Sequence, residues 1–198
     1  MDLFQEKLKL HLPDADVQYY PNFLSFDKAS HYFKVLKETV PWQQDTIKVF
    51  GKTYPQPRLT SLYGNNGKSY SYSNITMLPH IFEGELLEIK RRVDEKVEEV
   101  FTTCLLNLYR DGKDSNGWHA DDEAELGPNP TIASISLGHE RYFHLRYKKD
   151  KSVKHKLLLG HGSLLLMQGT TQQHWQHQIP KTAKKIGERI NLTFRIIN

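Results

Sequence analysis

The segment SNGWHADDEAELG, residues 115–127, gathers one histidine and four carboxylates next to a glycine. His119 and Asp121 are two residues apart, so in an extended segment both side chains point to the same side, as two ligands of one metal ion must. Downstream, HWQHQIP offers His174 and His177, of which one could be a third ligand. Two histidines and one carboxylate on one face of a metal are the arrangement of non-haem Fe(II) oxygenases. Alone, the H-x-D pattern is more typical of a solvated loop, and only a third ligand makes the metal site the better interpretation.

A second chemical feature is the polar face of the last predicted strand, RINLTFRII. With the two-residue period of a strand, its apolar side chains share one face. The other face carries Arg189, Asn191, Thr193 and Arg195. The segment CLLNLYR is divided in the same way and adds Asn107 and Tyr109. These faces could meet solvent, because charged side chains are seldom buried unpaired. If they line the interior of a barrel, they surround a cavity suited to a small dicarboxylate.

The elements that would carry these residues change in type along the chain. Residues 25–40, SFDKASHYFKVLKETV, have apolar side chains at helical spacing, and Ser25 is suited to cap the helix. Residues 80–100 repeat this amphipathic pattern. From Cys104 onward, short runs rich in β-branched and aromatic residues alternate with Gly, Pro and Asp. This spacing predicts a β-sandwich or β-barrel in the second half of the chain.

Bulk composition limits the class of protein. With 198 residues, 38% of them hydrophobic, the chain is long enough for one core and short for two. It has neither a leader pattern nor a run near the roughly 18 apolar residues of a membrane span, so we expect an intracellular protein, cytoplasmic or nuclear, without membrane contact. The single cysteine excludes an internal disulfide and a cysteine-based zinc cluster. The net charge of +4 permits a polyanionic partner without requiring one.

Five segments, in this order, resemble the AlkB family of Fe(II)- and 2-oxoglutarate-dependent dioxygenases: NLYRDGKDSNGWHADDE, IASISLG, HGSLLLMQG, HWQHQIPK and RINLTFR. The resemblance extends from about residue 19 to the C-terminus. It implies a single domain over residues 1–198 with an α+β, mainly β fold. The core would be a double-stranded β-helix, or jelly-roll, at about residues 104–198 with N-terminal amphipathic helices packed on it. A nucleotide-recognition region is implied at about residues 45–80.

The resemblance also implies roles for particular residues. Fe(II) would be held by His119, Asp121 and His177. The co-substrate 2-oxoglutarate would be held by Asn107, Tyr109, Arg189, Asn191 and Arg195, with Arg189 and Tyr109 at its distal carboxylate. O2 would take the position on the metal that the other ligands leave open. His174 would be structural, and His161 a turn residue.

The implied activity is oxidative demethylation of N-alkylated bases in DNA, of the 1-methyladenine and 3-methylcytosine type. It would be coupled to decarboxylation of 2-oxoglutarate to succinate, with release of formaldehyde. A base inside a duplex must be flipped out to reach the metal. The implied substrate-binding residues are Tyr70, Tyr72, Asp122, Phe50 and Arg58. Phe50, before Gly51, would be a wedge that fills the gap left by the flipped base.

These substrate residues could also have purely structural roles, and the function has alternatives too. The SYSYS segment is also typical of an exposed strand edge, and a Phe before a turn Gly often packs a small hydrophobic cluster. We expect a monomer that binds DNA, single- or double-stranded. One alternative is the same chemistry on RNA, or on both nucleic acids. Another is a nucleic-acid-binding module that keeps the fold without the metal.

Overall fold

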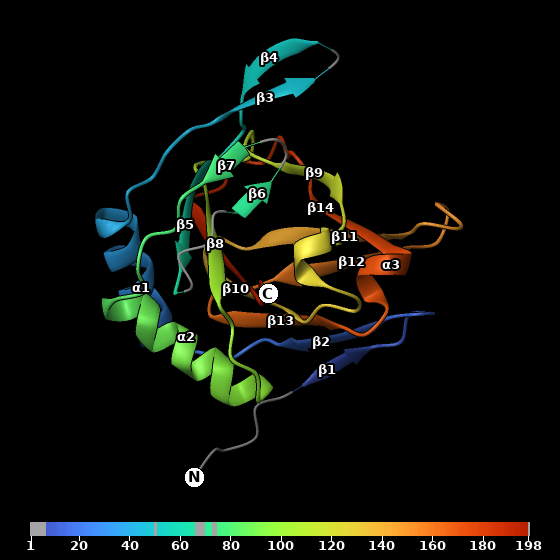
Figure 1. Cartoon of the computed structure of the whole chain (residues 1–198), viewed down its shortest axis with the longest axis horizontal. Coiled ribbons are helices and arrows are strands. Elements are labelled where there is room, and N and C mark those ends of the chain that lie inside the picture. The colour runs from blue at the N-terminus through green and yellow to red at the C-terminus, as the bar shows by residue number, and fades with distance from the viewer. Residues whose placement is uncertain (1–6, 50, 66–69, 73–74, 198) are drawn as a thin grey trace.

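Two antiparallel sheets that face each other form the framework of the molecule (Figure 1). The computed structural model describes residues 7–49, 51–65, 70–72 and 75–197. In spatial order, the large sheet contains β1 (Leu8–Leu10), β2 (Asp16–Tyr20), β13 (Ser163–Gln168), β10 (Ile132–Gly138), β15 (Arg189–Arg195), β8 (Thr103–Tyr109) and β5 (Leu59–Gly64). The small sheet contains β12 (Lys154–Leu159), β11 (Arg141–Tyr147), β14 (Trp175–Ile179) and β9 (Asn116–His119).

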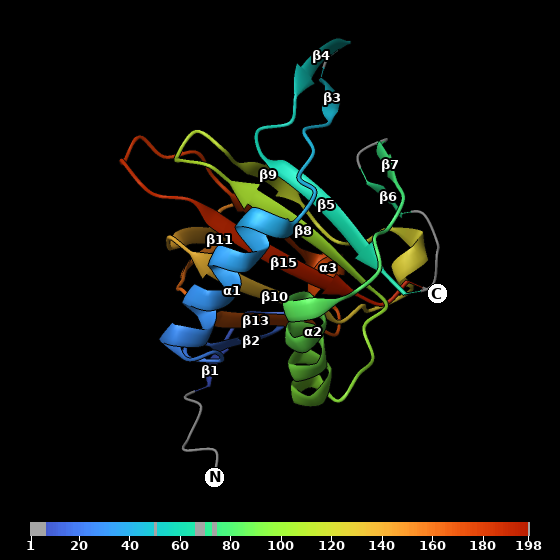
Figure 2. The ribbon, with the colours of Figure 1, turned by 90° about the vertical axis from the view of Figure 1, so that its left-hand side faces the viewer.

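Helices and short hairpins complete the described part of the chain. The helices are α1 (Phe26–Thr39), α2 (Gly84–Val97), the short α3 (Thr171–His174) and a 3-10 turn at Ala124–Leu126. The hairpins pair β3 (Thr46–Val49) with β4 (Lys52–Pro55), and β6 (Tyr70–Tyr72) with β7 (Ile75–Met77). Figure 2 shows α1 and α2 lying across one face of the large sheet, and the β3–β4 hairpin projecting away from both sheets.

The two N-terminal helices form where the amphipathic patterns predict them. The hydroxyl of Ser25 accepts a hydrogen bond from the backbone N–H of Lys28 at 3.4 Å, so it caps α1. The apolar stripe of α1 and that of α2 pack on the same side of the large sheet in one core cluster. The architecture confirms the predicted fold class, a mainly β chain with a jelly-roll core and N-terminal helices packed on it.

The alternation in β15 separates the helix-facing core from the interior between the sheets. Ile190, Leu192 and Phe194 belong to the core cluster under α1 and α2. The polar residues between them are also buried, and they line a cavity between the two sheets. The polar face of this strand is therefore turned toward the interior and not toward solvent.

Three strands of the large sheet lie before residue 104, outside the part of the chain that the sequence predicts to be β. β1 and β2 extend the sheet beyond β13, and β5 extends it beyond β8. β1 has only three residues, and five of the six residues of β5 are buried, so neither shows a clear period of two.

Among the described residues, no helix is long and apolar enough to cross a membrane.

Ile190→Ala tests the helix-facing side of β15. Ile190 is fully buried, so truncation leaves a cavity under α1 and should lower the free energy of unfolding by about 2–5 kcal/mol. Urea unfolding measures this change. Since Ile190 is absent from the lining of the inter-sheet cavity, ligand binding there should persist. A loss below about 1 kcal/mol would contradict the packing of this face.

Candidate metal and co-substrate site

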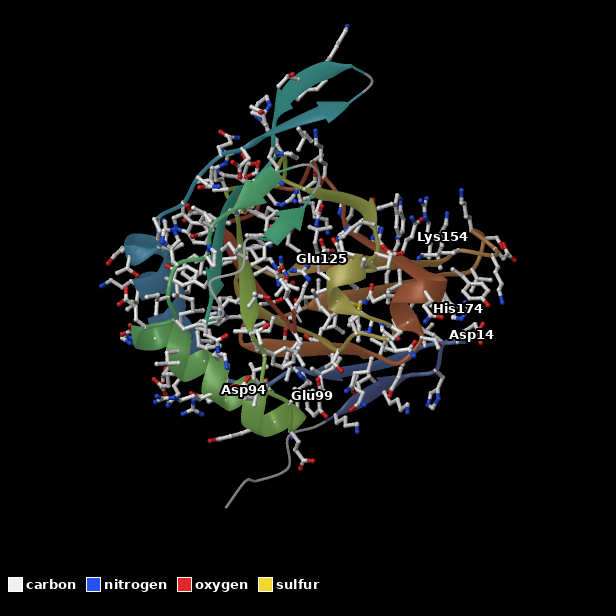
Figure 3. The ribbon with its side chains drawn as sticks, in the orientation of Figure 1. Asp14, Asp94, Glu99, Glu125, Lys154 and His174 are labelled. Carbon is white, nitrogen blue, oxygen red and sulfur yellow. The ribbon has the colours of Figure 1, made fainter. Side chains whose placement is uncertain are left out.

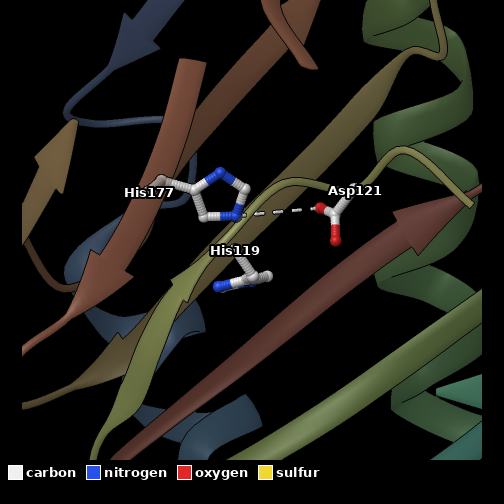
Figure 4. Close-up of side chains that lie close together, drawn as sticks. All are labelled: His119, Asp121 and His177. Carbon is white, nitrogen blue, oxygen red and sulfur yellow. Dashed lines mark ion pairs between the residues drawn. The ribbon is translucent and has the colours of Figure 1, made fainter. Parts of the chain in front are cut away.

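The three predicted metal ligands come together at one end of the small sheet. His119 is the last residue of β9, Asp121 follows it, and His177 lies in β14. The two strands pair with His119 directly opposite His177. One potential ligand atom from each of the three side chains lies within 4.8 Å of the others, and Nε2 of His177 is 3.9 Å from Oδ2 of Asp121 (Figure 4). This spacing would allow the three side chains to bind one metal ion.

Hydrogen bonds prepare His119 as a ligand. Its Nδ1 is 2.7 Å from the carbonyl oxygen of Gly117. A carbonyl oxygen can only accept, so Nδ1 carries the proton and Nε2 keeps its lone pair. The amide nitrogen of Asn116 lies 3.2 Å from that Nε2. The carbonyl behind the ring therefore holds the imidazole in the tautomer whose Nε2 can bind a metal, and a metal ion at Nε2 would take the place of the Asn116 amide.

The charges at the cluster suit a divalent cation. Burial by itself raises the pKa of the Asp121 carboxyl. The guanidinium of Arg195, 2.8 Å away, and the two neighbouring imidazoles lower this pKa by more, so the net result is a pKa of about 2. Burial and the neighbouring His119 lower the pKa of His177 to about 3, and burial also lowers the pKa of His119. At neutral pH the cluster is therefore one carboxylate and two neutral imidazoles, the protonation state that binds a metal.

Other buried contacts keep the ligands in place. The side-chain oxygen of Gln172, in α3, accepts a 2.9 Å hydrogen bond from the backbone N–H of Asp121. The ring of Phe143 stacks on that of His177, with ring centres 5.1 Å apart. These groups restrict the loop after β9 and the ring of His177, so the cluster is preorganised.

Metal affinity should depend little on pH near neutrality. Because the pKa values of Asp121, His119 and His177 are all lowered, protons compete weakly with the metal down to about pH 6. We expect the Kd for Mn(II) to rise less than about 3-fold between about pH 7.5 and about pH 6. Two histidines with ordinary pKa values would lose more than about 10-fold. Calorimetric titration at the two pH values distinguishes these outcomes.

A buried, cationic cavity adjoins the metal ligands. Asn107, Tyr109, Arg189, Asn191, Thr193 and Arg195 line it, together with the three candidate metal ligands. Those six come from β8 and β15, two neighbouring strands of the large sheet. In their register, Arg189 lies opposite Tyr109, and Asn191 opposite Asn107. The five predicted co-substrate residues therefore line a single cavity.

The guanidinium of Arg189 is buried at the wall of this cavity with only part of its hydrogen-bonding capacity used. Its side chain is 1% exposed, and its Nη2 donates to the hydroxyl of Ser136 at 2.9 Å. Its Nε and Nη1 have no hydrogen-bond partner within the part of the chain that the structure describes. Burial lowers the pKa of Arg189 to about 10, which still leaves it charged at neutral pH. A buried cation with N–H groups to spare is costly unless an anion joins it. A carboxylate of 2-oxoglutarate has the charge and the planar shape that fit.

Asn191 is held by the protein at both ends of its amide. The Nδ2 donates to the hydroxyl of Ser134 and the carbonyl of Ile135, and Oδ1 accepts from the hydroxyl of Thr193. This makes Asn191 a rigid wall of the cavity.

The predicted substrate residues are less closely grouped. Arg58 is buried and lines a second cavity with Trp118 and His119. Asp122 is exposed at the surface, where its carboxylate lies 2.9 Å from Nζ of Lys148. Phe50 lies outside the described residues. Tyr70 and Tyr72 belong to β6, but their side chains lie outside the description.

His174 and His161 occupy structural positions. His174 ends α3 and lies near Asp14 at the edge of the molecule (Figure 3), with its ring 6.3 Å from that of Tyr147. It is not part of the metal-binding cluster. The Nδ1 of His161 accepts from the backbone N–H of Gly138, and its Nε2 lies 3.1 Å from the hydroxyl of Ser30 in α1. His161 thus ties the first helix to the large sheet.

Several residues of the site carry no visible signal in the sequence. Arg141 is 4% exposed and donates to the carbonyl oxygens of Asp111, Asp114 and Pro180, with its Cζ 5.6 Å from the centre of the Tyr109 ring. Phe143 and Gln172 support the metal ligands, as described above. Their partners are 27 to 51 residues away along the chain, so no local pattern reveals them.

Comparison with known proteins agrees with this geometry. A jelly-roll with two histidines and one carboxylate beside a cationic cavity defines the class of non-haem Fe(II) oxygenases that use an anionic co-substrate. The family model described as "2OG-Fe(II) oxygenase superfamily" matches residues 16–195. The chain belongs to this superfamily and, within it, to the AlkB family, as its relatives establish.

Three proteins illustrate the similarity. The mouse protein named "Alpha-ketoglutarate-dependent dioxygenase alkB homolog 3" is 41% identical over 90% of this chain and 65% of its own length. "DNA oxidative demethylase ALKBH2" of Arabidopsis thaliana is 36% identical over 92% of this chain and 67% of its own. A solved structure titled "The structure of OsALKBH1" has a TM-score of 0.68 over 96% of this chain and all of that one, at 17% identity, and supports the fold alone. The chain spans just under two thirds of the alkB homolog 3 proteins.

Proposed function

We propose that this chain is an Fe(II)- and 2-oxoglutarate-dependent dioxygenase that removes N-linked alkyl groups from bases in DNA. The observation that carries the proposal is the juxtaposition of the metal-binding cluster and Arg189, a buried cation with two nitrogen atoms unpartnered among the described residues. The first suits Fe(II), and the second suits a dicarboxylate. The names of the mouse and Arabidopsis relatives support the co-substrate and the class of substrate.

Different residues would bind the metal, the co-substrate and the base. When bound, Fe(II), O2 and 2-oxoglutarate supply the oxidation of an N-methyl carbon to a hydroxymethyl group, which leaves as formaldehyde, with succinate and CO2 as the other products. His119, Asp121 and His177 would hold the metal. Arg189 would neutralise one co-substrate carboxylate and fix the direction of the molecule. The protein contributes geometry and charge, and no side chain needs to act as an acid or base.

The remaining substrate assignments belong to the same proposal. Arg58 and Asp122 would contact the nucleic acid, as would Tyr70 and Tyr72. Arg58 is supported by its place in the cavity that reaches His119. The net charge of +4 is compatible with a polyanionic substrate. A monomer acting on single- or double-stranded DNA completes the proposal, and Phe50 would favour the duplex by filling the gap left by a flipped base.

The first experiment is mass spectrometry of oligonucleotides containing 1-methyladenine, incubated with protein, Fe(II), 2-oxoglutarate and air. Single-stranded DNA, duplex DNA and matched RNA are compared, and His177→Ala is the control. Loss of the methyl group from DNA with the wild-type protein alone is the expected result. A preference for the RNA would transfer the same chemistry to RNA. Succinate formation without methyl loss would overturn the proposed substrate, and absence of both reactions would favour a binding module.

A further inference from the structure

A buried contact joins the linings of the two cavities beside the metal ligands. Arg58, just before β5, lines the second cavity, and Asn107 of β8 lines the co-substrate cavity. Both side chains are 4% exposed. The Nε of Arg58 donates to Oδ1 of Asn107 at 2.7 Å, and Nη1 donates to the carbonyl oxygen of Ser115 at 3.2 Å. The guanidinium is therefore anchored on β8 and on the segment before β9.

This contact decides which end of the Asn107 amide faces the co-substrate. A guanidinium has only donors, so Asn107 must turn its oxygen toward Arg58. Its Nδ2, at the other end of the same amide, makes no hydrogen bond within the described residues. An amide rotated by half a turn would instead present its oxygen to the ligand, and that oxygen would repel a carboxylate. The orientation matters because the ligand that fits this cavity is an anion.

We propose that Arg58 is a positioning residue for 2-oxoglutarate, acting through Asn107, whose amino group it turns toward the co-substrate. This role goes beyond contact with the nucleic acid, and it rests on the proposed function for the identity of the ligand. Because Arg58 also lines the cavity that reaches His119, it joins the wall of the co-substrate cavity to the side on which the base would approach.

The test is a double-mutant cycle on co-substrate affinity. 2-Oxoglutarate is titrated into the Mn(II)-loaded protein without O2, so that binding is measured in the absence of turnover. Arg58→Met and Asn107→Ala should each raise the Kd by about 10-fold, the scale of a lost support for a bound charge. In the double variant the Kd should also rise by about 10-fold, since Arg58 has nothing left to orient. Arg58→Lys should restore part of the affinity, because an ammonium can also donate to Oδ1.

Arg146→Met is the matched control for the loss of a positive charge. Arg146 stacks on Trp118, which lines the second cavity, and it pairs with Gln176 without touching Asn107. Its removal should change the Kd less than about 2-fold. Thermal unfolding and the Kd for Mn(II) should be close to wild type in each variant used. If Arg58→Met does not fold, the cycle is run with Arg58→Ala, which also removes the donor to Oδ1 of Asn107.

Additive effects, with a rise of about 100-fold in the double variant, would overturn the inference, because Arg58 would then act independently of Asn107. An unchanged Kd in Arg58→Met would overturn it as well. Both outcomes leave the proposed function intact. If the Mn(II)-loaded wild-type protein itself fails to bind 2-oxoglutarate, the proposed function fails and the inference fails with it.

Discussion

Asp121→Asn is expected to weaken Fe(II) binding by more than about 100-fold and to eliminate turnover. The amide keeps the shape of the side chain but removes the negative charge between two neutral imidazoles and Arg195. Two neutral ligands beside the positive charge of Arg195 cannot hold a divalent cation well. The loss should exceed the 10- to 100-fold typical of groups that only support a ligand. Anaerobic titration with Fe(II) or Mn(II) measures the affinity directly.

The adjacent carboxylate provides the matched control. Asp122 is exposed, pairs with Lys148 and lies outside the metal-binding cluster. Asp122→Asn should therefore leave the metal Kd within about 2-fold of the wild-type value. Equal losses in the two variants would mean that the carboxylates act through the general negative charge of the loop. A normal metal affinity in Asp121→Asn would remove Asp121 from the ligand set.

Arg189→Met is expected to raise the Kd for 2-oxoglutarate by about 100-fold or more. Truncating one partner of a buried charge pair costs several kcal/mol, much of it because the other charge is left buried without a partner. The ligand-free protein should respond differently. It should unfold at the same temperature as wild type or higher, because the variant removes a buried cation whose Nε and Nη1 lack partners in the described chain.

Two measurements on one variant separate binding from structure. Calorimetry on the Mn(II)-loaded protein gives the 2-oxoglutarate affinity, and thermal unfolding with and without the ligand gives the stability. Ile190→Ala, one residue away on the opposite face of β15, should show the reverse, with lower stability and retained ligand binding. A marked loss of stability in ligand-free Arg189→Met, with binding intact, would make Arg189 a packing residue.

The types and order of the metal-binding residues were visible without coordinates. His119 and Asp121 are two residues apart, the spacing at which the side chains of an extended segment point to the same side, and this expectation depends only on local backbone geometry. The same rule divides β15 and β8 into apolar and polar faces, and the helical patterns predict α1 and α2. These features could be predicted because each depends on residues close together in the chain.

Only the tertiary structure shows whether the polar faces of β15 and β8 are exposed to solvent or turned toward the interior. Alternation shows that Arg189 and Leu192 lie on opposite sides of a strand, but solvent and interior were equally compatible with the polar side. The second sheet closes over that side, and its strand β14 brings His177 opposite His119, 58 residues earlier in the chain. The contacts of Arg58 with Asn107 and of Gln172 with Asp121 likewise span 49 and 51 residues. A one-dimensional pattern records periodicity within a strand, whereas the pairing and stacking of distant strands create the cavity.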